Sequence, residues 1–208
     1  MNKNYKLFFN DLPDDISFLK GSIAIDTEAM GLNIKRDRLC LVQMCDENSN
    51  VVLVKYNTNC DYKSPNLVKL LEDENRLKIF HFARFDVAIM KHYLKIKSIN
   101  NIFCTKIASK LARTYTDRHG LKTLVSEICH VVMDKEQQTS NWGIDELSSE
   151  QIQYAISDVI YLHRMLDHLS KMLKTLNRYD LAIECFNTIN LIADLDIQDF
   201  GLRLFEHL

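Results

Sequence analysis

The acidic residues of this 208-residue sequence that could do chemistry together begin with the pair Asp26 and Glu28. They follow the apolar residues 23–25, and residues 22–26 are expected to form a short strand that ends at Asp26. On a strand, residues i and i+2 point to the same face, so the two carboxylates would project together. Two adjacent anions repel each other unless a cation lies between them. The pair indicates a metal site, although the same pattern also arises at ordinary surface strand ends.

Three further side chains could join this pair. Asp86 follows the apolar run 77–82, at the expected start of a helix, where the helix dipole alone would also favour an acid. Tyr154 and Asp158 are four residues apart in the clearest helical pattern of the sequence, so they are neighbours on one helix face. They lie at the boundary of its apolar stripe, where a tyrosine can face a cleft or simply pack.

Four carboxylates and a tyrosine together suit one chemistry. Two Mg²⁺ or Mn²⁺ ions about 3.5–4 Å apart need several carboxylate oxygens and can drive in-line cleavage of a phosphodiester. Such ions activate a water molecule and stabilise the leaving 3′-oxygen. A free tyrosine has a pKa of about 10, so Tyr154 is better suited to orienting that water than to acting as a strong base. The six cysteines form no CxxC pair and the histidines show no ligand spacing, which disfavours zinc.

The elements that must position these residues follow from apolar periodicity and turn residues. Ser64 and Pro65 indicate an N-cap and first position of a helix, and Ser148 with Gln151 indicates a capping box. Residues 133–147, which contain the only tryptophan, Trp142, are expected to form a long loop. Strands are expected at 22–26, 39–45, 51–56, 77–82 and 102–104, and helices after residue 64 and at 85–93, 105–114, 120–132, 148–173 and 179–193.

This order, a strand meander followed by alternating helices and strands, predicts an α/β fold with a mixed sheet flanked by helices and a helical C-terminus. The length favours a single domain over residues 1–208, and the 47% hydrophobic content is ordinary for a soluble globular protein. We find no membrane-spanning stretch and no signal peptide, and reduced cysteines fit a cytoplasmic protein.

The net charge of −2 argues against a protein that coats nucleic acid through bulk electrostatics, but not against an enzyme that acts on it. Acidic residues that hold divalent cations present a positive site within a near-neutral protein. Basic residues gather in 104–125 and in 164–178. Such runs are mostly solvated helix faces, and a track for a phosphate backbone is the alternative.

The sequence resembles the DEDD exonucleases, in the DEDDy branch that includes ribonuclease D and the exonuclease domain of the Werner helicase. Three stretches carry the resemblance, at 23–46 (IAIDTEAMGL…RLCLVQMCD), 80–92 (FHFARFDVAIMKH) and 139–165 (TSNWGIDELSSEQIQYAISDVIYLHRM). Residues 104–112 and 120–124 are also similar to ribonuclease D. The resemblance therefore covers nearly the whole chain, with the four acids and the tyrosine in order.

The resemblance implies a ribonuclease H-like fold with a mixed sheet of five to six strands. It implies that Tyr154 holds the attacking water and that two divalent ions, Mg²⁺ or Mn²⁺, are bound. The implied metal ligands, which are also the catalytic acids, are Asp26, Glu28, Asp86 and Asp158. The side chains implied to border the terminal nucleotide are Thr27, Met30, His81 and Phe82, of which the last two could equally be core residues.

We therefore expect a 3′–5′ exonuclease that releases nucleoside 5′-monophosphates, with a role in RNA processing or turnover. The expected partner is nucleic acid with a free 3′ end, RNA favoured over DNA and single-stranded or with a 3′ overhang; no protein or membrane partner is predicted. The chain looks like a short, single-domain form without the helical nucleic-acid-binding domains of ribonuclease D. No basic residue closely follows Trp142, unlike the family pattern, which weakens any expectation of tight RNA affinity. A catalytically silent nucleic-acid-binding module and a two-metal hydrolase of small phosphorylated metabolites remain as alternatives.

Overall fold

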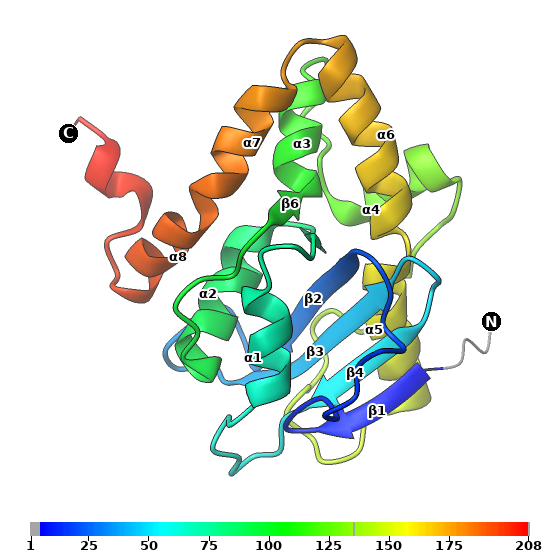
Figure 1. Ribbon diagram of the computed structural model, residues 1–208, viewed down its shortest axis with the longest axis vertical. Coiled ribbons are helices and arrows are strands. Elements are labelled where there is room, and N and C mark those ends of the chain that lie inside the picture. Colours follow the sequence, from blue (N-terminus) through cyan, green and yellow to red (C-terminus); the bar gives the residue numbers. More distant parts are fainter. Residues whose placement is uncertain (1–4, 135, 208) are drawn as a thin grey trace.

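A single mixed sheet organises the part of the chain that the computed structural model describes, residues 5–134 and 136–207 (Figure 1). Lys135, in the predicted loop 133–147, and both ends of the predicted domain 1–208 lie outside the described residues. The strand order is β1-β4-β3-β2-β5-β6, with β2–β3 and β3–β4 antiparallel and the other pairs parallel. The strands are β1 (Tyr5–Phe9), β2 (Ile23–Ala29), β3 (Leu39–Asp46), β4 (Val51–Lys55), β5 (Lys78–Phe80) and β6 (Ile102–Cys104).

Strand β2 extends further than the sequence predicted, because its ladder with β3 continues past Asp26. Glu28 still pairs with Leu41, and the register shifts only between Glu28 and Ala29. Asp26 and Glu28 therefore lie inside a paired strand and share one face, whereas Thr27 points to the other.

Strand β1 was not predicted. Tyr5, Leu7 and Phe9 alternate along it and are each more than a third exposed, so the burial that usually reveals a strand is weak here. It lies at the edge of the sheet and pairs only with β4, in parallel. Its formation depends on a partner distant in sequence, which local periodicity does not reveal.

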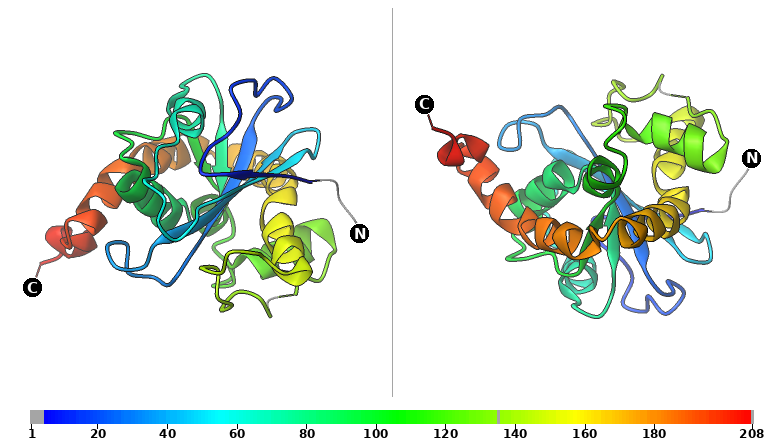
Figure 2. Two further views of the ribbon diagram at one scale, coloured as in Figure 1. Left: turned by 90° about the horizontal axis from the view of Figure 1, so that it is seen from below. Right: turned by 90° about the horizontal axis from the view of Figure 1, so that it is seen from above.

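Helices cover both faces of the sheet (Figures 1 and 2). Helix α5 packs on β2 and β3 from one side, and α2 lies on the opposite side, where α8 packs along it. The helices are α1 (Pro65–Glu72), α2 (Ala83–Leu94), α3 (Thr105–Ala112), α4 (Leu121–Leu124) with a π-helical turn (Val125–Cys129), α5 (Ser149–Ile160), α6 (Leu162–Thr175), α7 (Tyr179–Asn187), α8 (Ile189–Ile197) and a 3₁₀ turn (Gly201–Phe205).

Two predicted helices are each divided in the structure. The helix expected at 148–173 is α5 and α6, which meet at Tyr161, and the helix expected at 179–193 is α7 and α8, which meet at Thr188. Tyr161 and Thr188 keep near-helical backbone angles, so the apolar spacing hardly changes across either junction. The helix predicted at 120–132 ends earlier, where His130 adopts a left-handed conformation (φ 56°).

Helix α1 is capped by a residue that the sequence did not indicate. The Asp11 carboxylate accepts hydrogen bonds from the backbone N–H groups of Asn66 (3.0 Å) and Leu67 (2.9 Å). The expected cap, Ser64, donates its hydroxyl to the Asn10 carbonyl instead. At α5, by contrast, the capping box of Ser148 and Gln151 is formed as predicted.

The core lies on both sides of the central strands, where every residue of β3 and β4 is buried. Among the described residues, no helix is both long enough and apolar enough to span a bilayer.

Candidate active site

Three carboxylates meet between the sheet and α5. Asp26 and Glu28 project from the same face of β2, and Asp158 projects from α5, which packs against that face. One oxygen from each carboxylate lies within 4.8 Å of the others. Residues far apart in the sequence are thus brought to one point, as the metal-site prediction requires.

The fourth acid, Asp86, approaches from the first turn of α2 and is 4% exposed. It is outside the group of three carboxylates, and Thr27 donates its hydroxyl to the Asp86 Oδ1 atom at 2.7 Å. Burial raises the pKa of Asp86 to about 7, and the hydrogen bond from Thr27 opposes that rise. Thr27, predicted to border the nucleotide, is buried and orients this carboxyl group.

Burial and mutual repulsion disfavour the charged forms of the two β2 acids. Burial raises the pKa of Asp26 well above its ordinary value, and the charges of Asp86 and Asp158 raise it further. Burial also raises the pKa of Glu28, again reinforced by Asp158 and Asp86. The influence of Asp86 on both residues indicates that it belongs to the same electrostatic cluster.

Gln43 is a site residue that the sequence reasoning missed. It pairs with Asp26 in the β2–β3 ladder, and its side-chain amide donates to the Asp26 Oδ2 atom at 2.7 Å. Gln43 is 0% exposed and holds Asp26 in place from the neighbouring strand. A polar residue inside the apolar run 39–45 was the available signal, but its target depends on strand register.

Tyr154 lies one helical turn before Asp158 on α5, beside the carboxylates. Burial raises the pKa of Tyr154, and the charges of Asp158 and Glu28 raise it further, so its hydroxyl stays protonated at neutral pH. The ring packs against Trp142, with 5.9 Å between ring centroids. A protonated hydroxyl in this position can donate a hydrogen bond to a water molecule and orient it.

The remaining predicted substrate contacts differ in exposure. Met30 is 49% exposed and Phe82 is 44% exposed, so neither is a core side chain. Phe82 precedes α2 in a left-handed conformation (φ 69°), and the Lys106 ammonium lies 4.0 Å from its ring centroid. His81 is half-buried, and its Nδ1 atom lies 2.9 Å from the Thr105 hydroxyl.

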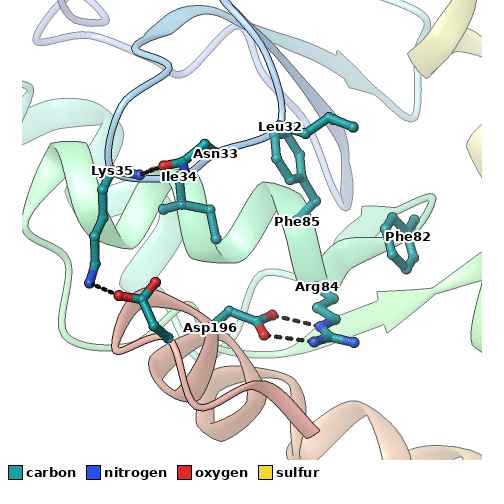
Figure 3. Close-up of a pocket in the computed structure, with 9 residues that line it drawn as sticks. Leu32, Asn33, Ile34, Lys35, Phe82, Arg84, Phe85 and Asp196 are labelled. Atoms are coloured by element: carbon teal, nitrogen blue, oxygen red, sulfur yellow. Dashed lines mark hydrogen bonds and ion pairs between the residues drawn. The ribbon is translucent and has the colours of Figure 1, made fainter.

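A pocket of about 310 Å³ adjoins this region between residues 32–35, the start of α2 and α8 (Figure 3). Phe82, just before α2, and Phe85, in its first turn, line the pocket, so it borders the turn that carries Asp86. Two ion pairs cross its other side: Arg84 with Asp196 (2.6 Å) and Lys35 with Asp199 (2.6 Å).

The donor set fits a hard divalent cation. Carboxylate oxygens are the ligands that Mg²⁺ and Mn²⁺ prefer, and a buried cluster of anions is stabilised by a cation among them. Asp26, Glu28 and Asp158 would hold such an ion, and Asp86 lies close enough to influence the site electrostatically.

A mixed sheet with a carboxylate cluster between β2 and a covering helix is the arrangement expected of a ribonuclease H-like nuclease. Comparison with known proteins agrees: the model of a 3′–5′ exonuclease family matches residues 8–174. Ribonuclease D from Sphingobium indicum is 33% identical over 158 residues, which are 76% of this chain and 40% of that protein. The chain belongs to the 3′–5′ exonuclease family.

Two solved structures resemble nearly the whole chain. NrnC from Brucella melitensis with bound Mg²⁺ is 40% identical, with a TM-score of 0.90, and the match covers 99% of this chain and 100% of that one. The same protein bound to pGG is 42% identical, with a TM-score of 0.85, covering 94% and 95%. These comparisons confirm, at the level of the family, the predicted ribonuclease H-like fold and the predicted class of enzyme, an exonuclease. The chain spans only 40% of the length of the ribonuclease D that it matches.

Proposed function

We propose that the chain is a two-metal-ion 3′–5′ exonuclease that hydrolyses phosphodiester bonds from the 3′ end of nucleic acid, RNA favoured, and releases nucleoside 5′-monophosphates. The observation that carries the proposal is the meeting of Asp26, Glu28 and Asp158 oxygens within 4.8 Å, beside Tyr154. In this proposal the protein acts in the cytoplasm, in RNA processing or turnover.

The proposed metal ligands are Asp26, Glu28 and Asp158, joined by Asp86. Mg²⁺ or Mn²⁺ bound there would supply activation of water and stabilisation of the charge on the leaving oxygen. A relative 40% identical over nearly its whole length has been solved with bound Mg²⁺, which supports the kind of ion. The count of two ions rests on the number of carboxylates and on the requirements of the chemistry.

The chain's own side chains would then fix the geometry. Gln43 and Thr27 each hold one carboxylate through a hydrogen bond of 2.7 Å, so the acids need little reordering. Tyr154 would donate its O–H to the attacking water and align it with the scissile phosphorus. The exposed side chains of Met30 and Phe82 offer apolar surfaces to the terminal nucleotide.

Short oligonucleotides are a second candidate substrate class. NrnC, 42% identical to this chain, has been solved bound to pGG. The pocket that Phe82 and Phe85 line is small, and a substrate of this size would not need a basic track for a long phosphate backbone.

The experiment compares 5′-labelled single-stranded RNA, matched DNA, a duplex with a 3′ overhang and pGG, each with Mg²⁺, with Mn²⁺ and with a chelator. We expect metal-dependent ladders that shorten from the 3′ end, fastest on RNA, with nucleoside 5′-monophosphates as products. The Asp158→Asn variant is the matched inactive control, because it removes one charge and keeps the side chain's shape.

Each alternative gives a different pattern in the same assay. Cleavage of pGG alone would favour the short-oligonucleotide class. Binding of RNA without any product would favour a silent module. Activity only on small phosphorylated metabolites, assayed alongside these substrates, would contradict the nuclease assignment, as would equal rates for Asp158→Asn and the unmodified protein.

A further inference from the structure

The segment 140–143, just before α5, is tied to the sheet by two basic side chains. The Lys55 ammonium, on β4, donates to the Trp142 carbonyl at 3.3 Å. The Arg38 guanidinium donates to the next carbonyl, that of Gly143, at 2.9 Å, and also to the Tyr56 carbonyl at 3.1 Å. The successive carbonyls of Trp142 and Gly143 thus accept hydrogen bonds from Lys55, at the end of β4, and from Arg38, just before β3.

Lys55 is unusual because its side chain lies inside the protein. It is 1% exposed, and the ion pairs of the described residues do not include it. Burial lowers its pKa. Burying an amine is costly unless it is hydrogen-bonded, and an apolar side chain would fill the space at lower cost. The Lys55 ammonium donates to the Trp142 carbonyl at 3.3 Å and, at the longer distance of 3.5 Å, to the Tyr56 carbonyl, and these bonds account for a lysine at this position.

The residue held in this way is in contact with the proposed active site. Trp142 is 1% exposed, and its ring lies 5.9 Å from that of Tyr154 at an angle of 45°. Aromatic pairs at such distances have preferred relative orientations, so the placement of one ring restricts the other. A shift of the 140–143 segment would consequently move the tyrosine hydroxyl.

Further contacts connect the same segment to the site. Gln151, one turn before Tyr154 on α5, donates to the Asn141 carbonyl at 3.2 Å. A side chain at Gly143 would meet the Met30 sulfur, because an added Cβ would lie 2.4 Å from it. The segment therefore packs between α5 and the end of β2, the two elements that carry the carboxylates.

We propose that Lys55 and Arg38 are positioning residues for Tyr154, acting through Trp142. The inference rests on the proposed function, because it requires that Tyr154 takes part in cleavage. In a purely structural role the two cations would affect stability alone, whereas here they affect the rate of cleavage through Tyr154.

Trp142 is the only tryptophan of the chain, so its fluorescence reports directly on the segment. The variants are Lys55→Met, Arg38→Gln and the conservative Arg38→Lys, with Lys63→Met as the control, since the Lys63 side chain is 84% exposed. We expect a red-shifted emission and stronger acrylamide quenching in Lys55→Met and Arg38→Gln. We expect neither change in Lys63→Met and partial recovery in Arg38→Lys.

Kinetics test the link to Tyr154. Misplacement of a reacting group by about 1 Å can cost roughly 100-fold in rate, so we expect kcat to fall about 10- to 100-fold, with KM little changed. In a Tyr154→Phe background the same substitutions should cause no further loss, because residues that act through one group are not additive. Additive losses, or a lower kcat with unchanged Trp142 fluorescence, would overturn the proposal.

The two readouts separate this inference from the proposed function. If the unmodified protein cleaves no nucleic acid, the proposed function fails, and fluorescence still decides whether the cations hold Trp142. An unchanged spectrum in every variant would then overturn the inference. If Lys55→Met does not fold, Arg38→Gln carries both tests, since Arg38 is half-buried and lies just before β3.

Discussion

The carboxyl groups of the site are buried or half-buried and lie close together, and Asp26 and Asp86 each accept a hydrogen bond from a neutral donor. Gln43 bonds to Asp26 and Thr27 bonds to Asp86, both at 2.7 Å. Neutral donors fix the orientation of an acid without cancelling its charge. The charge is therefore left to be balanced by a cation, which is consistent with the raised pKa values of Asp26 and Glu28 in the metal-free protein.

The Tyr154→Phe variant tests the role of a single hydroxyl group. The phenyl ring keeps the packing against Trp142, whereas the donor to the attacking water is lost. We expect kcat to fall by roughly 10²–10⁴, the usual scale for a positioned proton-handling group, with little change in melting temperature. Single-turnover cleavage of labelled RNA measures the rate. The control is Tyr115→Phe, at an exposed tyrosine, and equal rates for both variants would assign Tyr154 to packing alone.

The sequence predicts the acids and the tyrosine of the site more readily than the residues that hold them in place through hydrogen bonds. Asp26, Glu28 and the pair on α5 follow from spacing rules that hold within one element. Gln43 and Lys55 lie inside or at the end of apolar strands, and what they bind depends on strand register and on a loop distant in sequence. Those contacts exist only after folding, so no local pattern indicates them.

At the scale of elements, the sequence predicts whether a segment is a helix or a strand better than it predicts where that helix or strand begins and ends. All five expected strands are present, because each is a compact apolar run, but β1 was missed at the sheet edge. The divided helices were read as continuous because each pair buries one continuous apolar face. The cap of α1 illustrates the same limit: Asp11 reaches it from another segment, while the local candidate Ser64 bonds elsewhere.

The attachment of α8 to the segment between α2 and β6 offers a test at this scale. The Asn190 side chain accepts a hydrogen bond from the Ile99 N–H (3.0 Å) and donates to the Ile99 carbonyl (2.9 Å). Ile99 is 0% exposed, so Asn190→Ala would leave both backbone groups without these partners. We expect a loss of about 1–3 kcal/mol in the free energy of unfolding, measured by urea denaturation. Asn187→Ala, at an exposed position nearby, should cost far less, and equal losses would contradict this account.

At the scale of the whole molecule, the site joins the two halves of the fold. Asp26 and Glu28 come from the antiparallel part of the sheet, Asp86 from the helix after the parallel strand β5, and Asp158 from a later helix on the other face. Bringing these charges together opposes folding in the absence of a cation. The stability of the metal-free protein should therefore report on the protonation of the site.

The sign of that dependence follows from the pKa of Asp86, which burial raises to about 7 from an ordinary value near 3.8. Between these two pH values the folded state binds more protons than the unfolded state. The protein is therefore most stable below pH 3.8, and this stability is lost as the pH rises through about 7. Each unit of difference corresponds to about 1.4 kcal/mol. We expect the melting temperature, measured in a chelator, to fall between about pH 4 and pH 7. The fall should be smaller in Asp86→Asn, and the control Glu74→Gln, at an exposed position, should follow the unmodified protein.

Saturating Mg²⁺ or Mn²⁺ should stabilise the protein most at the upper end of this pH range, because the ions bind the deprotonated acids. A melting temperature that rises with pH in the chelator, or that falls equally in Asp86→Asn, would show that protonation of Asp86 does not control stability.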